Sequence, residues 1–191
     1  MRDVYFHEDD YRQIEILPID NLSFCIKEIG DIEKSASENF DGFGYKDIHI
    51  REENPSELIS LSISENELED KLSAHLPKYD NVYTGYSSYR EQCTGTFAFG
   101  KDDQETIFYE TSNGNCSAIW VSDPLEELLY LPYLEKLLFV DWSWGFVCPL
   151  IESKKYLEYI NNRSQEIKRR MAEYKASLNQ NLPKKPWWKL W

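Results

Sequence analysis

The sequence predicts an α+β domain in which an antiparallel sheet, built as a meander, packs with several helices and is followed by a long C-terminal amphipathic helix. Three observations predict it. Four short runs rich in β-branched and aromatic residues lie between residues 82 and 121, separated by polar turns. Helix signals stand on both sides of these runs, and apolar residues recur every three or four positions near the C-terminus. The 191-residue chain is 41% hydrophobic and 15% aromatic, enough for one globular core.

The N-terminal residues predict two strands joined by a hairpin. Val4–His7 and Gln13–Leu17 are short runs rich in aliphatic and aromatic residues, which favour extended backbone. The acidic corner between them, Glu8-Asp9-Asp10, suits a hairpin connection.

A helix, a turn and a further strand are predicted next. Asn21 can cap a helix whose apolar residues recur at three-residue spacing, namely Ile26, Ile29 and Ile32. Gly30 weakens this helix, because glycine is a poor helix former. The glycine-containing stretch 39–44 predicts a turn, and Asp47–Ile50 alternates like a strand.

A second helix is predicted from a capping box at Ser64–Glu67, where the hydroxyl and the carboxylate satisfy each other's backbone amides. Pro77 ends this helix. Its apolar face is formed by Leu68, Leu72 and either His75 or Leu76.

The predicted meander fills the middle of the chain. Polar turns at residues 101–103 and 112–115 separate its later strands. The four strands are Val82–Tyr86, Thr94–Phe99, Thr106–Tyr109 and Ser117–Val121.

The last third predicts two more helices. Asp123 with Pro124 marks the start of one, because proline is tolerated in the first turn. Residues 139–150 follow as an aromatic strand or loop. In a strand, Trp142, Trp144 and Phe146 would lie on one face, which is either part of the core or a platform for a ligand or partner. The final helix runs from about Glu152 to Leu178 and completes a single domain over residues 1–178. A basic, Trp-rich tail occupies residues 179–191.

The sequence shows no catalytic, cofactor-binding or metal-binding motif. Its four cysteines lie far apart without a C-x-x-C pair, and its three histidines have no His or Cys at ligand spacing. No serine stands in a G-x-S-x-G context, and residues 41–44 lack the third glycine of a dinucleotide fingerprint. We therefore expect no metal, no cofactor and no enzyme, with catalytic groups that converge only in the fold as the alternative. The first ten residues carry no apolar signal-peptide core, so a cytoplasmic location with reduced thiols is expected.

Charge is distributed unevenly along the chain. Residues 1–162 contain 13 Lys and Arg against 32 Asp and Glu, a net charge of −19, whereas residues 163–191 contain 8 against 2 and carry +6. An acidic body repels nucleic acid and anionic membrane and attracts basic proteins. The same charge also serves solubility alone. Helix dipoles explain acidic residues at helix starts, but not those predicted in hairpin connections, at Glu8–Asp10 and Asp102-Asp103.

The tail combines lysine with tryptophan. Residues 183–191 have the composition of a membrane-interface anchor, although two prolines prevent a continuous helix. The alternative is a tail that folds back and packs its indoles onto the acidic body.

Residues 4–18 (Val-Tyr-Phe-His-Glu-Asp-Asp-Tyr-Arg-Gln-Ile-Glu-Ile-Leu-Pro) and 140–146 (Val-Asp-Trp-Ser-Trp-Gly-Phe) resemble bacterial immunity proteins. These accompany polymorphic toxins of the contact-dependent growth inhibition or Rhs kind, and the resemblance covers residues 1–160 without the basic tail. It implies a protein that binds a cognate toxin domain, often a nuclease, and blocks its active site or a neighbouring exosite.

A basic nuclease surface would suit an acidic inhibitor, with aromatic residues as anchors. The predicted partner-binding residues combine the acidic connections with nearby tyrosines and are Glu8, Asp9, Asp10, Tyr11, Tyr83, Tyr86, Asp102 and Asp103. The alternatives are a small cytosolic enzyme and a peripheral membrane adaptor that uses the tail.

Overall fold

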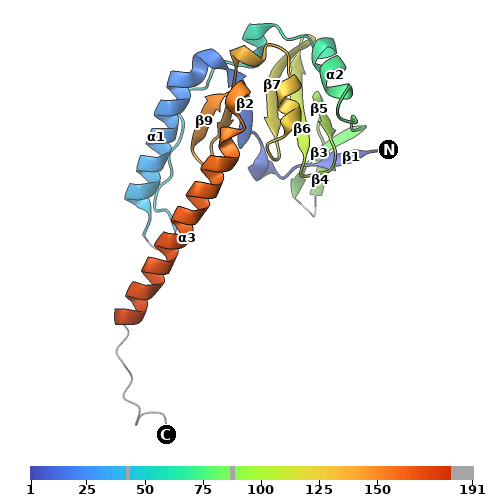
Figure 1. Cartoon of the computed structure of the whole chain (residues 1–191). Helices are drawn as coiled ribbons and strands as arrows, with labels where there is room; N and C mark the ends of the chain where they lie inside the picture. The colour runs from blue at the N-terminus through green and yellow to red at the C-terminus, as the bar shows by residue number, and fades with distance from the viewer. Residues whose placement is uncertain (42–43, 87–88, 182–191) are drawn as a thin grey trace. The chain divides into compact units, whose positions relative to one another are not determined.

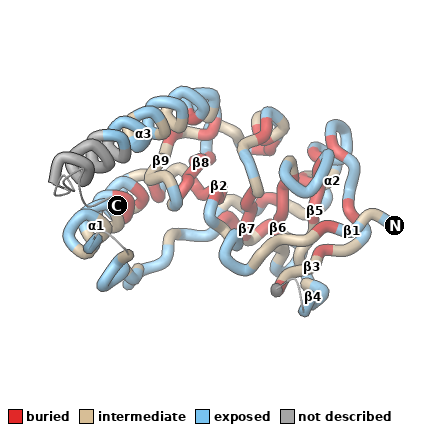
Figure 2. Tube along the Cα trace, turned by 90° about the horizontal axis from the view of Figure 1, so that it is seen from below, coloured by how far each residue is buried: buried red, intermediate tan, exposed pale blue. Residues whose placement is uncertain are grey.

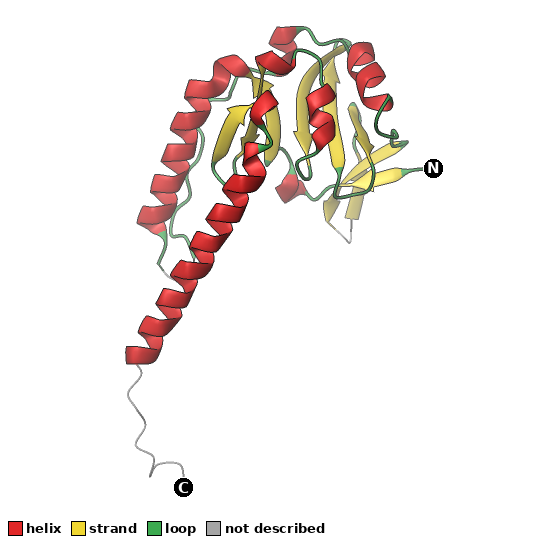
Figure 3. Cartoon of the chain, in the orientation of Figure 1, coloured by secondary structure: helices red, strands yellow, loops and turns green. Residues whose placement is uncertain are grey.

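The computed structural model describes residues 1–41, 44–86 and 89–181, and it confirms an α+β protein with an antiparallel sheet (Figures 1 and 3). The chain divides into two compact units. The first unit, residues 1–153, contains both sheets and helices α1 and α2. The second unit, residues 154–191, contains helix α3 (Lys155–Asn181). The predicted domain boundary at residue 178 stays a prediction.

The larger sheet has six antiparallel strands in the order β5-β6-β7-β2-β8-β9. Their bounds are β2 Ile14–Pro18, β5 Thr96–Gly100, β6 Thr106–Ser112, β7 Asn115–Val121, β8 Leu137–Asp141 and β9 Phe146–Pro149. The predicted meander is confirmed for β5, β6 and β7, which pair in sequence order. Strand β2 enters the middle of the sheet, and all five of its residues are buried.

The smaller sheet corrects two predictions. It contains β1 (Asp3–Tyr5), β3 (Asn81–Tyr86) and β4 (Tyr89–Gln92), and β1 pairs with β3 in parallel. The predicted N-terminal hairpin is therefore wrong, and Glu8–Asp10 form a short 3-10 helix, η1, between the two sheets. The predicted first meander strand is wrong in its partner, since it belongs to this smaller sheet as β3. The reason is that the apolar β2 gains more burial between β7 and β8 than it would beside β1.

The two helices of the first unit were predicted, and their capping was predicted in part. Helix α1 spans Leu22–Asn39 and helix α2 spans Glu65–Ser73. The α2 cap is confirmed, because Ser64 Oγ accepts from the Glu67 amide at 3.2 Å. Asn21 does not cap α1 with its side chain, which instead exchanges two 2.9 Å hydrogen bonds with the Ser56 backbone.

Three local predictions are wrong. The strand predicted at Asp47–Ile50 is absent, and these four residues are mostly exposed. The helix predicted at Asp123 is a short 3-10 helix, η4 (Glu126–Tyr130). Trp142 and Trp144 lie in the turn between β8 and β9, closed by a 3.0 Å hydrogen bond from the Trp144 amide to Asp141 Oδ1, and Phe146 begins β9. These three residues therefore do not alternate across one strand. The turn predicted at 39–44 includes residues 42 and 43, which lie outside the described residues.

Each face of the larger sheet is covered by different elements, and Figure 2 shows the buried residues along its central strands. One face meets the smaller sheet in the cluster Val4, Tyr79, Val82, Ala98, Phe108, Ala118 and Trp120. The same face meets α1 in the cluster Leu17, Cys25, Leu138 and Val140. The opposite face meets α2, where Tyr109 donates to Glu69 Oε1 at 2.5 Å. The short 3-10 helix η3 (Leu58–Leu61), whose Leu58 is fully buried, contacts β2 and β7.

Short 3-10 helices complete the first unit, namely η2 (Ile19–Asn21), η5 (Leu134–Lys136) and η6 (Leu150–Glu152). In the part of the chain that the structure describes, no helix has both the length and the apolar composition needed to span a bilayer.

Candidate functional site

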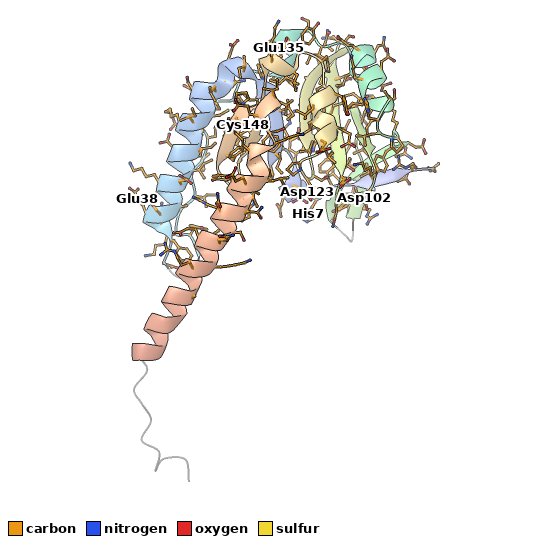
Figure 4. The ribbon with its side chains drawn as sticks, viewed as in Figure 1. His7, Glu38, Asp102, Asp123, Glu135 and Cys148 are labelled. Atoms are coloured by element: carbon orange, nitrogen blue, oxygen red, sulfur yellow. The ribbon has the colours of Figure 1, made fainter. Side chains whose placement is uncertain are left out.

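The sheet register brings the acidic connections to one end of the larger sheet, where β2 and β6 begin and β7 and β8 end. Val121, at the end of β7, pairs with Ile107 of β6 and with Ile14 of β2, and Ile14 also pairs with Asp141 of β8. The segment before β2, the β5–β6 turn and the segment after β7 therefore all leave the sheet at this end of the strands. We call this end the acidic edge and define it by Glu8, Asp9, Asp10, Asp102, Asp103, Glu105 and Asp123. Figure 4 labels His7, Asp102 and Asp123 on this side of the first unit.

Most of these carboxylates are exposed, and the negative charges of neighbouring carboxylates repel one another. Partial burial raises the pKa of Asp123, and the neighbouring Glu105 and Asp141 raise it further. Lys101 lies 3.1 Å from Glu105 and 3.0 Å from Glu127 (Nζ to carboxylate oxygen) and offsets part of the charge. The edge therefore keeps an excess of negative charge.

Local geometry explains why two of the acidic segments sit where they do. Asp102 Oδ1 accepts from the amides of Gln104 and Glu105 at 3.0 and 2.9 Å, which shapes the β5–β6 turn. His7 Nδ1 accepts from the Asp9 amide at 3.2 Å and so caps η1. Asp102 thus has a structural role beside its charge, whereas the neighbouring Asp103 is exposed at the same turn.

The predicted tyrosines have three different outcomes. The ring of Tyr11 stacks on Phe6 and meets the edge of Trp120, its hydroxyl donates to Glu110 at 3.0 Å, and 41% of the residue remains exposed beside η1. Tyr83 is half-buried in β3, a strand that contacts η1. Tyr86 ends β3, and its side chain lies outside the described part of the chain. Of the three tyrosines, the structure thus places Tyr11 beside η1. Asp102 and Asp103 lie at the same end of the larger sheet, in the turn before β6, which is two strands from β2.

A cavity of about 370 Å³ forms a second site, on the face of the larger sheet that Glu15 shares with Leu17 and Trp120. Its walls include Ala118 from the cluster beneath the smaller sheet and Leu17 and Trp142 from the cluster beneath α1. Residues 11–17 around the start of β2 and the segment 51–57 form most of the remaining wall. Its charged walls are Arg12, Glu15, Arg51 and Glu57.

Glu15 is the buried acid of this cavity. Its residue is 5% exposed, and its carboxylate accepts a 2.7 Å hydrogen bond from the Trp142 indole nitrogen. Burial raises the pKa of Glu15, although the Trp142 hydrogen bond and the charges of Arg12 and Arg51 act in the opposite direction. Among the described residues, neither arginine lies within ion-pair distance of this carboxylate.

The two arginines of the cavity are held by different contacts. Arg12, at a left-handed φ of 53°, forms a 2.7 Å ion pair with Glu110, while its Nε is buried and has no hydrogen-bond partner among the described residues. The guanidinium of Arg51 lies 4.1 Å from the ring centroid of Trp142, and its Nε is 3.9 Å from a carboxylate oxygen of Glu28. Both side chains thus have donors left for a further acceptor.

Sequence patterning missed Glu15. Alternation along Gln13–Leu17 buries Ile14 and Ile16 and points Glu15 outward, which holds only if one face of the strand is solvated. Because β2 is central and covered on both faces, Glu15 is buried as well. The available signal was a carboxylate inside an otherwise apolar run, since buried polar residues are the informative ones.

In the described residues, no group of three or more His, Cys, Asp or Glu side chains is arranged to hold a metal ion. Comparison of the chain with protein-family models, with curated proteins and with solved structures finds no match.

Proposed function

We propose that this chain is an inhibitor of the immunity kind, which binds a basic toxin domain through its acidic edge. The observation that carries the proposal is the gathering of exposed acidic connections from three separate chain segments at one edge of one sheet. A net charge of −19 over residues 1–162 adds long-range attraction for a basic partner.

Tyr11 supplies the aromatic anchor of this surface. Its ring is fixed against Phe6 and Trp120 and its hydroxyl against Glu110, so little side-chain entropy is lost when a partner covers the exposed part. Carboxylates around such an anchor give steering and specificity, and the anchor gives affinity.

In this proposal the C-terminal helix keeps its predicted amphipathic character. Apolar positions such as Leu157, Ile160 and Ile167 recur at helical spacing within α3. Residues 155–181 contain more basic than acidic side chains, so α3 would contribute little to the binding of a basic partner. Of the predicted tail, residues 179–191, the first three residues belong to α3 and residues 182–191 lie outside the described residues. The membrane-adaptor alternative depends on this tail.

The proposal predicts a toxin gene next to the gene of this chain, and the test is calorimetric titration with the toxin domain that this gene encodes. The variant Asp103→Asn/Asp123→Asn removes two negative charges at the acidic edge while keeping the side-chain shapes. The control Glu38→Gln/Glu135→Gln removes two exposed negative charges elsewhere, at positions labelled in Figure 4.

The edge variant is expected to weaken binding about 10-fold at about 50 mM salt, and the control to change it less than about 2-fold. Raising the salt to about 300 mM should reduce the difference between them, because exposed charges are screened. Equal effects of the two variants would show that net charge, rather than the edge, determines binding. No complex at low salt would refute the proposal.

The cavity around Glu15 favours a second candidate function, the binding of a small molecule. The same cavity bears on the alternative of an enzyme whose catalytic groups converge only in the fold. Such an enzyme requires a carboxylate of raised pKa in a cavity, and Glu15 has both features.

A further inference from the structure

The cavity lined by the start of β2, the segment 51–57 and Trp142 combines two arginines with an acid that has no cationic partner in contact in the described part of the chain. Arg12 Nε is buried and unpartnered among the described residues, and Arg51 makes one long contact to Glu28, at 3.9 Å. The buried Arg12 Nε is closed to a ligand, but the other N–H groups of the two arginines that line the cavity can donate to an acceptor there. Arg12, Arg51 and Glu15 all line the cavity, and among the described residues neither arginine forms an ion pair with the Glu15 carboxylate.

We propose that this cavity binds a small organic acid, whose carboxylate accepts hydrogen bonds from Arg12 and Arg51 and shares a proton with Glu15. Guanidinium groups match carboxylates in both charge and geometry, which makes arginine the usual residue for this recognition. The proposal does not rest on toxin binding, although Tyr11, the proposed toxin anchor, also lines the cavity.

Glu15 decides the protonation state of the complex. Two carboxylates in one site cannot both ionise easily, so the bound acid and Glu15 hold one proton between them. The charged groups that act on Glu15 are Arg12 and Arg51, with Glu57 also on the cavity wall and Glu28 next to Arg51. Two further titratable groups are Tyr11 on the cavity wall and Cys25 of α1, and burial raises the pKa of the Cys25 thiol to about 12. Binding should therefore take up a proton at neutral pH and strengthen as the pH falls toward about 5.

The remaining walls select the body of the ligand. Ile16, Leu17, Ala118 and the Trp142 ring provide apolar surface, and Ser56 and Ser117 provide small polar groups. A volume of about 370 Å³ lies at the lower end of the range for pockets that bind organic ligands, roughly 300–1,000 Å³. The occupant is thus a compact acid with an apolar body, rather than a nucleotide or a long chain.

The experiment titrates the full chain with acetate, isobutyrate and benzoate by ligand-observed NMR, beside benzamide and benzylamine as neutral and cationic controls. At least one acid is expected to saturate below about 10 mM and to bind at least about 10-fold more tightly than the amide and the amine. Its affinity should be higher at about pH 5.5 than at about pH 8.

Two variants and one control locate the binding. Arg51→Gln is expected to weaken binding of the acid at least about 10-fold, since it removes charged hydrogen bonds. Glu15→Gln should bind without the pH dependence of the native chain. Arg90→Gln removes an exposed arginine on β4, whose guanidinium lies 4.7 Å from the Tyr5 ring centroid, and should change nothing.

Circular dichroism and thermal melting verify that each variant is folded. The proposal is overturned if no acid saturates, if benzamide or benzylamine binds as tightly as the best acid, or if Arg51→Gln and Arg90→Gln bind alike. None of these results bears on the toxin complex, whose own titration uses different variants.

Discussion

The carboxylates of the acidic edge and the carboxylate of Glu15 are the same chemical group in opposite surroundings. At the edge, Asp102 and Asp103 lie in a solvated turn where water and backbone amides stabilise their charge. In the cavity, Glu15 has lost most of its water and keeps one indole hydrogen bond and two distant guanidinium groups. The exposed charges of the acidic edge therefore reduce the free energy of unfolding little, whereas the buried charge of Glu15 reduces it more. Protonation of Glu15 or binding of a ligand would remove this loss of stability.

A third carboxylate, Glu69 on α2, lies between these two cases. It accepts from the buried Tyr109 hydroxyl and pairs closely with Lys78. Partial burial acts to raise the pKa of Glu69, but the hydrogen bonds from Lys78 and Tyr109 outweigh it and the pKa is lowered. Glu15 and Glu69 should therefore give opposite responses of stability to pH.

The largest effect is expected from Trp142→Phe, which removes the hydrogen bond to the buried Glu15 carboxylate. At pH 7 the variant should lose about 2 kcal/mol of unfolding free energy, the cost of losing a hydrogen bond to a charged group. Urea denaturation measures it. The loss should shrink as the pH falls and Glu15 is protonated, and it should be smaller when Glu15→Gln is already present. A loss that is independent of both would mean that the ring packing, rather than the hydrogen bond, is responsible.

Glu69→Gln is expected to cost about 1.5 kcal/mol at pH 7, since it removes the ion pair with Lys78 and weakens the bond from Tyr109. Because the folded-state pKa of Glu69 is lowered, its contribution is present above the unfolded pKa of about 4.3 and is lost as the pH falls through the folded value. Denaturation curves of the native chain and the variant should thus converge at low pH. A constant difference from pH 7 down to pH 3 would contradict the assignment.

Glu15→Gln is expected to do the reverse and stabilise the protein, by about 1 kcal/mol at pH 7, as found when buried charge is replaced by neutral groups. The folded-state pKa of Glu15 is raised, so the native chain loses stability as the pH rises from the unfolded pKa of about 4.3 to the folded value. Native and variant chains should be equally stable below about pH 4 and diverge above it. A variant less stable than the native chain at pH 7 would show that the Arg12 and Arg51 charges outweigh the burial.

Much of the fold could be predicted from local signals. The α2 cap at Ser64 and the β5–β6–β7 meander depend on residues close in sequence, and both are confirmed. The strand partners of β1 and β2 could not be predicted, because β1 pairs with β3 some 78 residues away (Asp3 with Asn81). The competition between these distant pairings depends on total burial, which no single segment reveals.

The candidate sites divide in the same way. The acidic connections were visible because charge runs in turns are a local pattern, and the sheet register then supplied their common edge. The cavity was not visible, because Arg12, Glu15, Arg51 and Trp142 meet only through the fold. A carboxylate inside an apolar strand was the one signal, and its meaning depended on β2 being central.

The smallest effect is expected from Asp103→Asn, which repeats the Glu15 change at the acidic edge. Asp103 is exposed, and surface substitutions of this kind change the unfolding free energy by less than about 0.5 kcal/mol. Any change should favour the variant slightly, because the removed charge lies near other carboxylates, and added salt should abolish it. Measured by urea denaturation at low and high salt, this variant separates charge that is kept for a partner from charge on which the fold depends. A loss above about 1 kcal/mol would mean that Asp103 shapes the turn as Asp102 does, and the acidic edge would then have a structural explanation that requires no partner.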